Sequence, residues 1–248
     1  MSLGISDAAW RALQSRIRLG ERIGRGEEIL ALDRPHRHAT VMIEGVACSY
    51  ERLIDGSRQI FIFLHPGDFC DLIQQVRPKA GKEIAVAAAT DCTTGVIENG
   101  HLEELIAQHP SVALALWRAA VLEVSIYRER LLSMRRGLAL QCVAHVLCEQ
   151  LVRREAVGIN NALIPLSQID LADATGLSVV HINRTFKKLQ ELKVLSKQGR
   201  GMKVMDSGRL VTLAAFDGSY LDIPQLFSGW AVESGSTQSV FRTELHDR

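Results

Sequence analysis

The feature that most constrains the fold is a segment of 24 residues, Ser167 to Gln190, in which two short amphipathic patterns meet at a glycine. Ser167 can cap a first helix and Ser178 a second, because a serine hydroxyl accepts hydrogen bonds from the free N–H groups at a helix start. Gly176 supplies the left-handed backbone angle of a tight turn, and Leu177 can fill the space between the helices. The pattern therefore predicts a helix, a turn and a helix. The residues expected to face the core are Ile169, Leu171 and Ala174 in the first helix and Ile182, Phe186 and Leu189 in the second.

The opposite face of the second helix is polar and basic. Asparagine, arginine and histidine side chains can hydrogen-bond the edges of bases, and a helix that carries them fits the major groove of DNA. Arg184 is the candidate for a bidentate contact with guanine, whereas Val179 or Val180 can touch a thymine methyl group. Lys187 and Lys188 are better suited to phosphates. The complete set of candidate DNA-binding residues is Ser167, Ser178, Val179, Val180, His181, Asn183, Arg184, Lys187, Lys188 and Arg200.

Two short apolar stretches after this segment flank a glycine-rich turn, Gln198 to Gly201. They predict a two-stranded wing beside the second helix, with Arg200 at the turn as a further phosphate contact. Between Gly176 and Arg209 eight basic residues stand against two acidic ones, a net charge of +6 in a chain of net charge +1. Such asymmetry is expected of a face that binds phosphates. A helical hairpin used only for packing is the alternative.

The region from Ala39 to Ile97 has the pattern of short antiparallel strands. Asp55-Gly56 separates two apolar-rich runs, Val46 to Leu53 and Gln59 to Leu64, which is a strong hairpin signal. Pro66-Gly67-Asp68 then ends the second run, because proline and glycine interrupt a strand. We expect an antiparallel roll or barrel in this part of the chain.

A long helix is predicted after the strands. Pro110 is expected to end a short helix over His101 to His109, and Ser111 to cap a helix that runs to about Arg136. Apolar residues recur along it at spacings of four and three, which is the pattern by which two helices pack side by side. Further apolar residues on other faces favour two partners, the roll and a second copy; the alternative is that the stripe covers only its own roll. The predicted dimer seam consists of Ala113, Trp117, Ala120, Val124, Tyr127, Leu131 and Met134.

Taken in order, four features make the chain resemble the Crp/Fnr superfamily of bacterial transcription regulators. They are Pro66-Gly67-Asp68-Phe69 in the roll, the long helix after Pro110, the segment Ser178 to Arg184 and the turn Gly199-Arg200-Gly201. The match extends over roughly residues 29–220. The resemblance implies an effector-sensing roll of the cyclic-nucleotide-binding type, a dimerisation helix, a palindromic operator and contact with RNA polymerase.

We therefore expect an α+β chain in four parts. These are an effector-sensing antiparallel β-roll (1–110), a dimerisation helix with a hinge at Gly137 (111–137), a winged helix-turn-helix (138–222) and a C-terminal tail (223–248). The expected function is sequence-specific transcription regulation by a homodimer, not catalysis. Since the longest apolar runs fall short of the roughly 20 residues of a membrane span and no signal-peptide pattern is present, we expect a cytoplasmic protein. Five scattered cysteines without CxxC spacing indicate buried, reduced thiols.

Departures from the family bear on the signal. Cyclic-nucleotide-binding members carry a Gly-Glu pair soon after the Pro-Gly-Asp turn and an Arg-Ser/Thr-Ala run about ten residues later, whereas this chain has Asp71-Leu72 and Lys82-Glu83 there. A carboxylate beside the phosphate position opposes an anion, so we do not expect cAMP to bind. No cysteine precedes Cys48, so no N-terminal iron-sulfur cluster is expected; haem held by a histidine or cysteine stays open. We predict no cofactor and an unknown small effector, with Asp71, Leu72, Lys82 and Glu83 as its candidate pocket.

His36, His38 and Glu44 suggest an alternative function, that of a metalloenzyme. Three such side chains on an early strand can bind a divalent metal in a cupin-like enzyme. Cupin barrels need a second group of ligands beyond a Pro-Gly turn, and here Phe69, Cys70 and Asp71 follow that turn. The two histidines therefore fit solvated loop positions better, and we predict no metal site.

Overall fold

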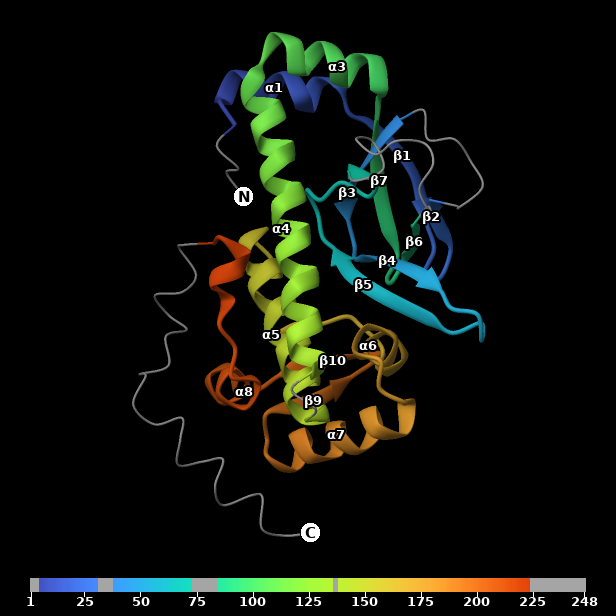
Figure 1. The fold of residues 1–248 in the computed structure, drawn as a ribbon, viewed down its shortest axis with the longest axis vertical. Helices are drawn as coiled ribbons and strands as arrows, with labels where there is room; N and C mark the ends of the chain where they lie inside the picture. The colour runs from blue at the N-terminus through green and yellow to red at the C-terminus, as the bar shows by residue number, and fades with distance from the viewer. Residues whose placement is uncertain (1–4, 31–37, 73–83, 136–137, 224–248) are drawn as a thin grey trace.

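The computed structural model of the chain describes residues 5–30, 38–72, 84–135 and 138–223 (Figure 1). A β-roll lies above a smaller helical domain, and helix α4 (Pro110–Arg135) runs beside both of them. Helices α1 (Asp7–Arg16) and α3 (Asn99–Gln108) cover the upper end of the roll. The predicted fold class is confirmed: an α+β chain with an antiparallel roll, a long helix and a C-terminal winged helix-turn-helix.

Two antiparallel sheets form the roll. Strands β4 (Ala47–Arg52) and β5 (Arg58–Leu64) make the hairpin predicted around Asp55-Gly56. Arg52 pairs with Arg58, and Gly56 has a φ of +83°. Glycine adopts this angle without steric cost, which explains its position in the turn. One sheet has the order β1 (Arg18–Ile23), β7 (Cys92–Glu98), β3 (His38–Glu44), and the other β2 (Glu28–Leu30), β6 (Ala85–Ala88), β4 (Ala47–Arg52), β5 (Arg58–Leu64).

Helix α4 begins two residues earlier than predicted. The sequence suggests Ser111 as the cap, but Pro110 is the first helical residue and Ser111 lies inside the helix. Proline suits the first position of a helix because its φ is already helical and its missing N–H would have no partner there. Pro110 therefore starts α4 as well as ending the α3 segment.

The helical domain holds the predicted helix-turn-helix and wing. Strands β9 (Leu195–Gln198) and β10 (Gly201–Val204) form the wing. Strand β8 (Leu163–Ile164) pairs with β10 on its other side, so the small sheet has three strands rather than two. Its elements are α5 (Ala139–Ala156), β8 (Leu163–Ile164), α6 (Gln168–Thr175), α7 (Val179–Glu191), β9 (Leu195–Gln198), β10 (Gly201–Val204), α8 (Ser207–Ala214) and the 3-10 helix η1 (Gly218–Leu221).

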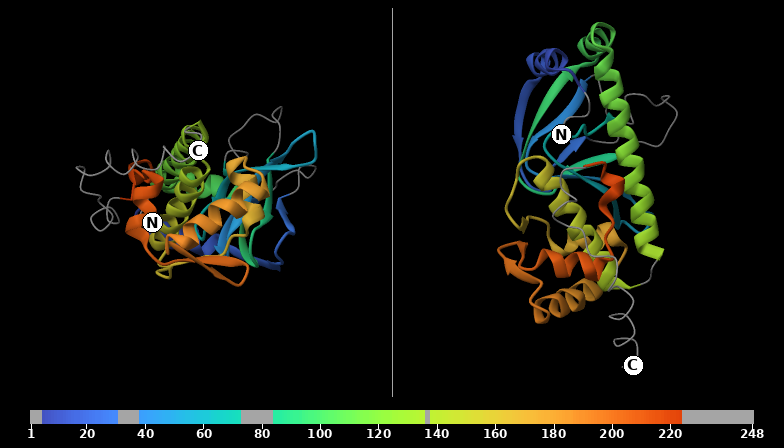
Figure 2. Two further views of the ribbon diagram at one scale, coloured as in Figure 1. Left: turned by 90° about the horizontal axis from the view of Figure 1, so that it is seen from below. Right: turned by 90° about the vertical axis from the view of Figure 1, so that its left-hand side faces the viewer.

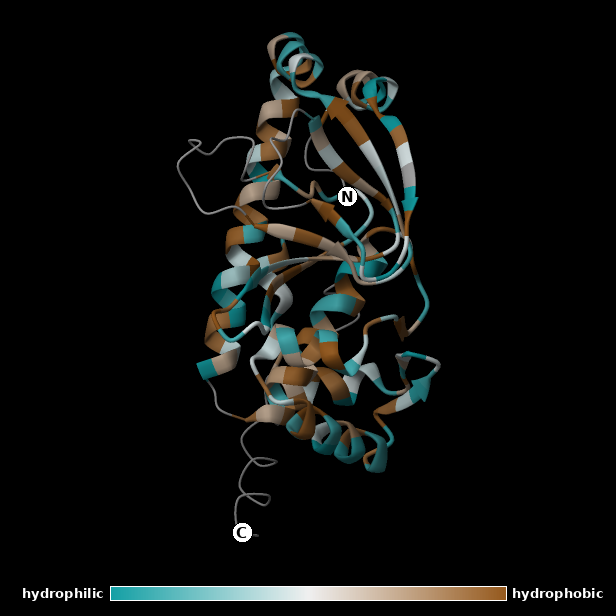
Figure 3. Cartoon of the chain, turned by 90° about the vertical axis from the view of Figure 1, so that its right-hand side faces the viewer, coloured by the Kyte–Doolittle hydropathy of each residue, from teal (hydrophilic) through white to brown (hydrophobic). Residues whose placement is uncertain are grey.

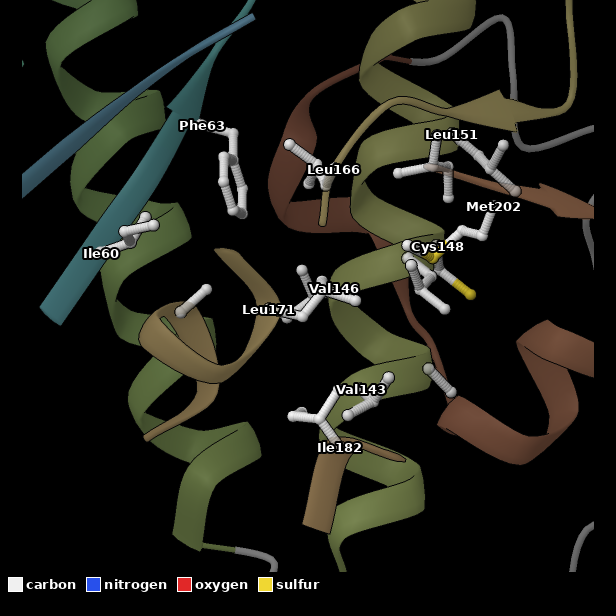
Figure 4. Close-up of a cluster of buried hydrophobic side chains, with 14 of the residues drawn as sticks. Ile60, Phe63, Val143, Val146, Cys148, Leu151, Leu166, Leu171, Ile182 and Met202 are labelled. Carbon is white, nitrogen blue, oxygen red and sulfur yellow. The ribbon is translucent and has the colours of Figure 1, made fainter. Parts of the chain in front are cut away.

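Helix α5 joins the two halves of the molecule through one core. Fourteen of its 18 residues are buried. Val143 and Leu147 of α5 belong to the same apolar cluster as Phe63 of the roll and Leu171 and Ile182 of the helix-turn-helix (Figure 4). Apolar burial at about 25 cal/mol per Å² makes this cluster a main source of stability, shared by both halves.

The cysteines are part of these cores. All five are buried and none of them forms a disulfide, as predicted. Burial in apolar surroundings disfavours the thiolate and raises the pKa of the Cys48 thiol to about 12. Since the thiolate is the reactive form, Cys48 is an inert packing residue at neutral pH.

Candidate nucleic-acid interface

The start of α6 and the turn after it have the predicted geometry. The Ser167 hydroxyl accepts a hydrogen bond from the Asp170 N–H (3.1 Å), and the Asp170 carboxylate accepts one from the Ser167 N–H (2.8 Å). This reciprocal pair is a capping box. Gly176 ends α6 with a φ of +69°, and the Ser178 hydroxyl accepts from the His181 N–H (3.3 Å) to start α7. The helix-turn-helix prediction is confirmed.

Helix α7 divides into a buried and an exposed face. Ile182, Phe186 and Leu189 are buried as predicted, together with Thr185. In Figure 3 the hydrophilic side of α7 lies at the lower end of the molecule, away from the roll. Every outward residue predicted for this helix is exposed: Val179, Val180, His181, Asn183, Arg184, Lys187 and Lys188.

The prediction that Ile169 faces the core is wrong. Its side chain is 57% exposed, whereas Leu171 and Ala174 are fully buried. Successive residues in a helix are rotated by about 100°, so residues two apart lie nearly on opposite sides and cannot share a face. The Ile169 side chain instead lines a solvent-open groove together with Val179 of α7.

A groove separates α6 and α7 from the wing. It is open to solvent, has a volume of about 440 Å³, and is lined by Ser167, Ile169, Val179, Lys197 and Arg200 among others. Gly199 turns the wing with a φ of +59°. The predicted phosphate contact Arg200 therefore lies across a groove from the start of the recognition helix α7. Both basic residues that line the groove, Lys197 and Arg200, belong to the wing, so the wing side is the one suited to phosphates.

The outer face of α4 is apolar and exposed. Its inner face packs on its own chain through Val112, Ala115 and Ile126, which are buried. Five residues of the predicted seam are exposed: Ala113, Trp117, Val124, Leu131 and Met134. Ala120 is half-buried. Tyr127 lies edge-on to the Phe61 ring and donates a hydrogen bond to Glu123. The exposed apolar stripe is thus rotated slightly about the helix axis from the predicted seam. Because the stripe is exposed, it does not serve to cover the roll of its own chain. Its large residues are Leu114 (46% exposed), Trp117 (70%), Val121 (49%), Val124 (58%), Leu131 (68%) and Leu132 (46%).

By length and composition α4 is also apolar enough to cross a membrane. Its most apolar stretch of 18 residues has a mean hydropathy of 1.2, and 17% of that stretch is buried. However, Val112 and Ile126 on its inner face pack against two different clusters of the same chain. The inner face of α4 is therefore covered by its own chain.

Of the four candidate effector residues, Asp71 and Leu72 lie in the described part of the chain. The Asp71 side chain is buried, and both of its carboxylate oxygens accept hydrogen bonds from the Thr40 N–H (3.1 and 3.2 Å). This carboxylate therefore holds β3 to the chain after the Pro-Gly turn. Leu72 lines a cavity, while Lys82 and Glu83 lie outside the described residues, as does Gly137.

The cavity that Leu72 lines lies between the roll, α1 and the inner face of α4. Its volume is about 150 Å³. Its polar groups are Asp68, Glu123 and Arg153, of which Arg153 pairs with Asp68 at 2.6 Å. Burial raises the pKa of the Glu123 carboxyl, partly offset by its hydrogen bond with Tyr127. The apolar part of the wall includes Trp10, Leu13, Leu64, Ala115, Ala119 and Ile126.

The metal-enzyme alternative is not supported. His38 and Glu44 are the first and last residues of β3. Six steps along a strand, at about 3.3 Å each, separate them by roughly 20 Å, so they cannot share a metal ion. His36 lies outside the described residues.

The sequence of the chain is similar to those of known transcription regulators. Residues 141–213 match the family model of the Crp-like helix-turn-helix domain. Over 197 residues the chain is 30% identical to the transcriptional activatory protein AadR of Rhodopseudomonas palustris, covering 78% of this chain and 80% of that protein. It is also 30% identical over 176 residues to the nitrogen fixation regulation protein FixK of Bradyrhizobium diazoefficiens, covering 70% and 73%.

Solved structures show the same fold. FixK2 from Bradyrhizobium japonicum aligns with a TM-score of 0.67 at 27% identity, over 81% of this chain and 98% of that one. The c-di-GMP responsive global regulator CLP of Xanthomonas campestris aligns with a TM-score of 0.65 at 14% identity, over 81% and 100%. With its roll, long helix and exposed recognition helix, the chain belongs to the Crp/Fnr family of DNA-binding transcription regulators.

Proposed function

We propose that the chain binds a palindromic operator as a homodimer and reads the bases with α7. The observation that carries this proposal is the outward face of α7, which projects from one end of the molecule (Figure 2). The apolar stripe of α4 supports the dimer, because it runs toward the same end. Two copies joined along α4 carry two α7 helices, and a spacing of about 34 Å places them in successive major grooves.

Within α7 the side chains have different tasks. Arg184 donates to the two acceptors of guanine, and Asn183 and His181 are within one turn of it. Val179 and Val180, 43% and 58% exposed, supply the apolar contact for a thymine methyl group. Lys187, Lys188 and the wing residue Arg200 bind phosphates and fix the register of the helix.

An alanine substitution of Arg184 tests this assignment. We expect Arg184→Ala to weaken binding to a duplex selected by the wild-type protein from a random pool by about 1 to 3 kcal/mol, and to relax specificity at one position. Lys187→Ala is the matched control, which should weaken binding to all duplexes alike and reduce the dependence on salt. An equal loss for Arg184→Ala on selected and random DNA would make Arg184 a phosphate contact, and failure of the wild type to select any sequence would refute base reading.

We infer that a small, largely apolar effector binds in the cavity between the roll and α4 and regulates the protein from there. A cavity of about 150 Å³ holds a benzene-sized group, and Glu123 and Arg153 can bind one polar substituent. Phenol is a suitable probe: it should raise the melting temperature of the wild type and not that of Ala119→Phe, whose ring would fill the cavity. Equal shifts in both proteins would contradict this site.

We further infer the cellular setting from the relatives. AadR is named a transcriptional activatory protein. We infer that the operator-bound dimer likewise contacts RNA polymerase, in the cytoplasm where the promoter lies. A reporter fused to a promoter carrying the selected duplex should respond to the intact chain and not to Arg184→Ala; an equal response to both would contradict operator-dependent regulation.

A further inference from the structure

We propose that Arg25 and Arg58 of the roll are positioning residues for the recognition helix, acting through Asp170 and Asp173 of α6. This inference rests on the proposed two-fold DNA complex. None of these four residues lies on the outward face of α7. Their effect on DNA binding would come from the angle at which the roll holds the helix-turn-helix.

Three ion pairs join the roll to α6, and the longest of them places Arg58 Nη2 3.7 Å from Asp170 Oδ1. The Arg58 Nε and Nη2 atoms donate to the Asp173 carboxylate at 3.0 and 2.8 Å, and Arg25 Nη2 donates to Asp170 at 2.8 Å. The arginine side chains are 26% exposed, and those of Asp170 and Asp173 are 8% and 19% exposed. Surface ion pairs contribute little, but charged hydrogen bonds that are largely withdrawn from water are stronger and fix geometry.

The two arginines come from different parts of the roll. Arg25 lies in the turn between β1 and β2, and Arg58 is the first residue of β5. Arg58 is itself placed by the Tyr50 ring, whose centroid lies 5.3 Å from the guanidinium carbon. On α6 the two acceptors are three residues apart and therefore adjacent on one face. Two anchors along a helix fix its rotation as well as its tilt.

Asp170 links this anchor to the start of the helix. The same carboxylate that pairs with Arg25 also accepts the Ser167 N–H in the capping box, at 2.8 Å. The orientation of α6 passes to α7 through the Gly176 turn and through Leu171 and Ile182, which share one core. The ion pairs therefore act on a rigid unit that includes the recognition helix.

In a dimer, the angle between the roll and α6 affects where the two recognition helices lie. Helix α4 packs on the roll, so in a dimer the roll keeps a fixed position relative to the partner helix. The angle between roll and α6 thus determines the distance between the two α7 helices in a dimer. If the orientation varies, only a fraction of molecules fits two grooves, and the apparent affinity falls by that fraction.

The test compares Arg58 with its neighbour Arg52 in the full-length chain. Arg52 lies 5.6 Å from the centroid of the same Tyr50 ring, but its charge faces Glu28 at 3.8 Å and it is 57% exposed. On the duplex selected by the wild type, Arg58→Asp should weaken binding by about tenfold. The double variant Arg58→Asp with Asp173→Arg should recover to within about threefold, and Arg52→Ala should match the wild type.

Spin labels give a readout that does not need DNA. Cysteines introduced at the exposed positions Leu19 and Glu191 report the distance between roll and α7, since the native cysteines are buried. The distance distribution should broaden in Arg58→Asp and narrow again in the charge-swapped double variant. Unchanged distributions and affinities would overturn the inference, and tighter binding by Arg58→Asp would show that the pairs hold α7 away from DNA. If the wild type selects no duplex, the proposed function fails, while the distances still decide the positioning role.

Discussion

His65 is enclosed where the roll meets α5, and its surroundings determine its protonation. Its Nε2 atom lies 3.0 Å from Gln150 Oε1, and the Gln150 amide nitrogen donates to Glu149 at 3.2 Å. The amide oxygen therefore faces His65, so the ring carries its proton on Nε2. Complete burial, and then the nearby Arg153 charge, lower the pKa of His65 well below its usual value of 6.5.

This lowered pKa predicts a loss of stability in acid. Because the neutral ring is the native form, the unfolded chain binds the proton more readily, and stability decreases as the pH falls below 6.5. Between about pH 7.5 and about pH 5.5 we expect the free energy of unfolding of the wild type to fall by about 1.4 kcal/mol more than that of His65→Gln. Urea unfolding at the two pH values measures the difference. Equal losses in the two proteins would show that His65 is not held neutral.

The surroundings of Gly176 and Gly100 predict different effects of a glycine-to-alanine substitution on stability. Gly176 has a φ of +69°, and an added Cβ would lie 3.1 Å from the Met134 methyl carbon. Gly176→Ala should therefore destabilise the protein by about 1 to 2 kcal/mol. Gly100, in α3, has nothing within 4 Å of an added Cβ, so Gly100→Ala should be neutral or stabilise by up to about 1 kcal/mol. Thermal unfolding measures both changes, and destabilisation by Gly100→Ala would contradict the comparison.

At the scale of elements, the exposed stripe of α4 predicts the state of association. Glutamate at both Val124 and Leu131, 58% and 68% exposed, would place charges in a dimer seam. We expect this double variant to be monomeric and folded, because like charges would lose their water on association. Leu19→Glu is the control, since Leu19 is 72% exposed on β1. Sedimentation equilibrium gives the masses, and an unchanged dimer mass for the double variant would refute the seam.

Elements with local signals were predictable from the sequence. The hairpin at Asp55-Gly56, the capped turn at Gly176 and the wing turn at Gly199 each depend on neighbouring residues, and the structure has all three. The outward face of α7 followed from the spacing of Ile182, Phe186 and Leu189 for the same reason. Most of the candidate DNA-binding surface was therefore readable from sequence alone.

Elements that depend on distant partners were not predicted. Strands β1 and β2 were missed, because β1 is largely polar and pairs with β7 about 70 residues later. Ile169 was assigned to the core from its hydrophobicity, although its position on the helix points it to solvent. Asp71 was assigned to an effector pocket by alignment, and only the fold shows its carboxylate bonded to β3. The ion pairs of Arg25 and Arg58 have no local signal either.

At the scale of the whole molecule, the shared core predicts joint loss of stability. Leu147 of α5 is fully buried in the cluster that spans both halves. Leu147→Ala should cost about 2 to 5 kcal/mol and lower amide protection in the roll strand β4 and in α7 together. Leu102→Ala is the control, because Leu102 belongs to the separate cluster under α1 and α3. Hydrogen exchange distinguishes the two variants, and a loss confined to α7 in Leu147→Ala would contradict a common core.

The burial of α5 limits how this regulator can be recombined. A chimera that grafts the DNA-reading half onto a foreign sensor would leave the apolar flank that meets Tyr50, Ile60 and Phe63 bare. It would also leave the carboxylates of Asp170 and Asp173 without their arginines. A working exchange of sensors must therefore transplant the underside of the roll along with the helices that rest on it.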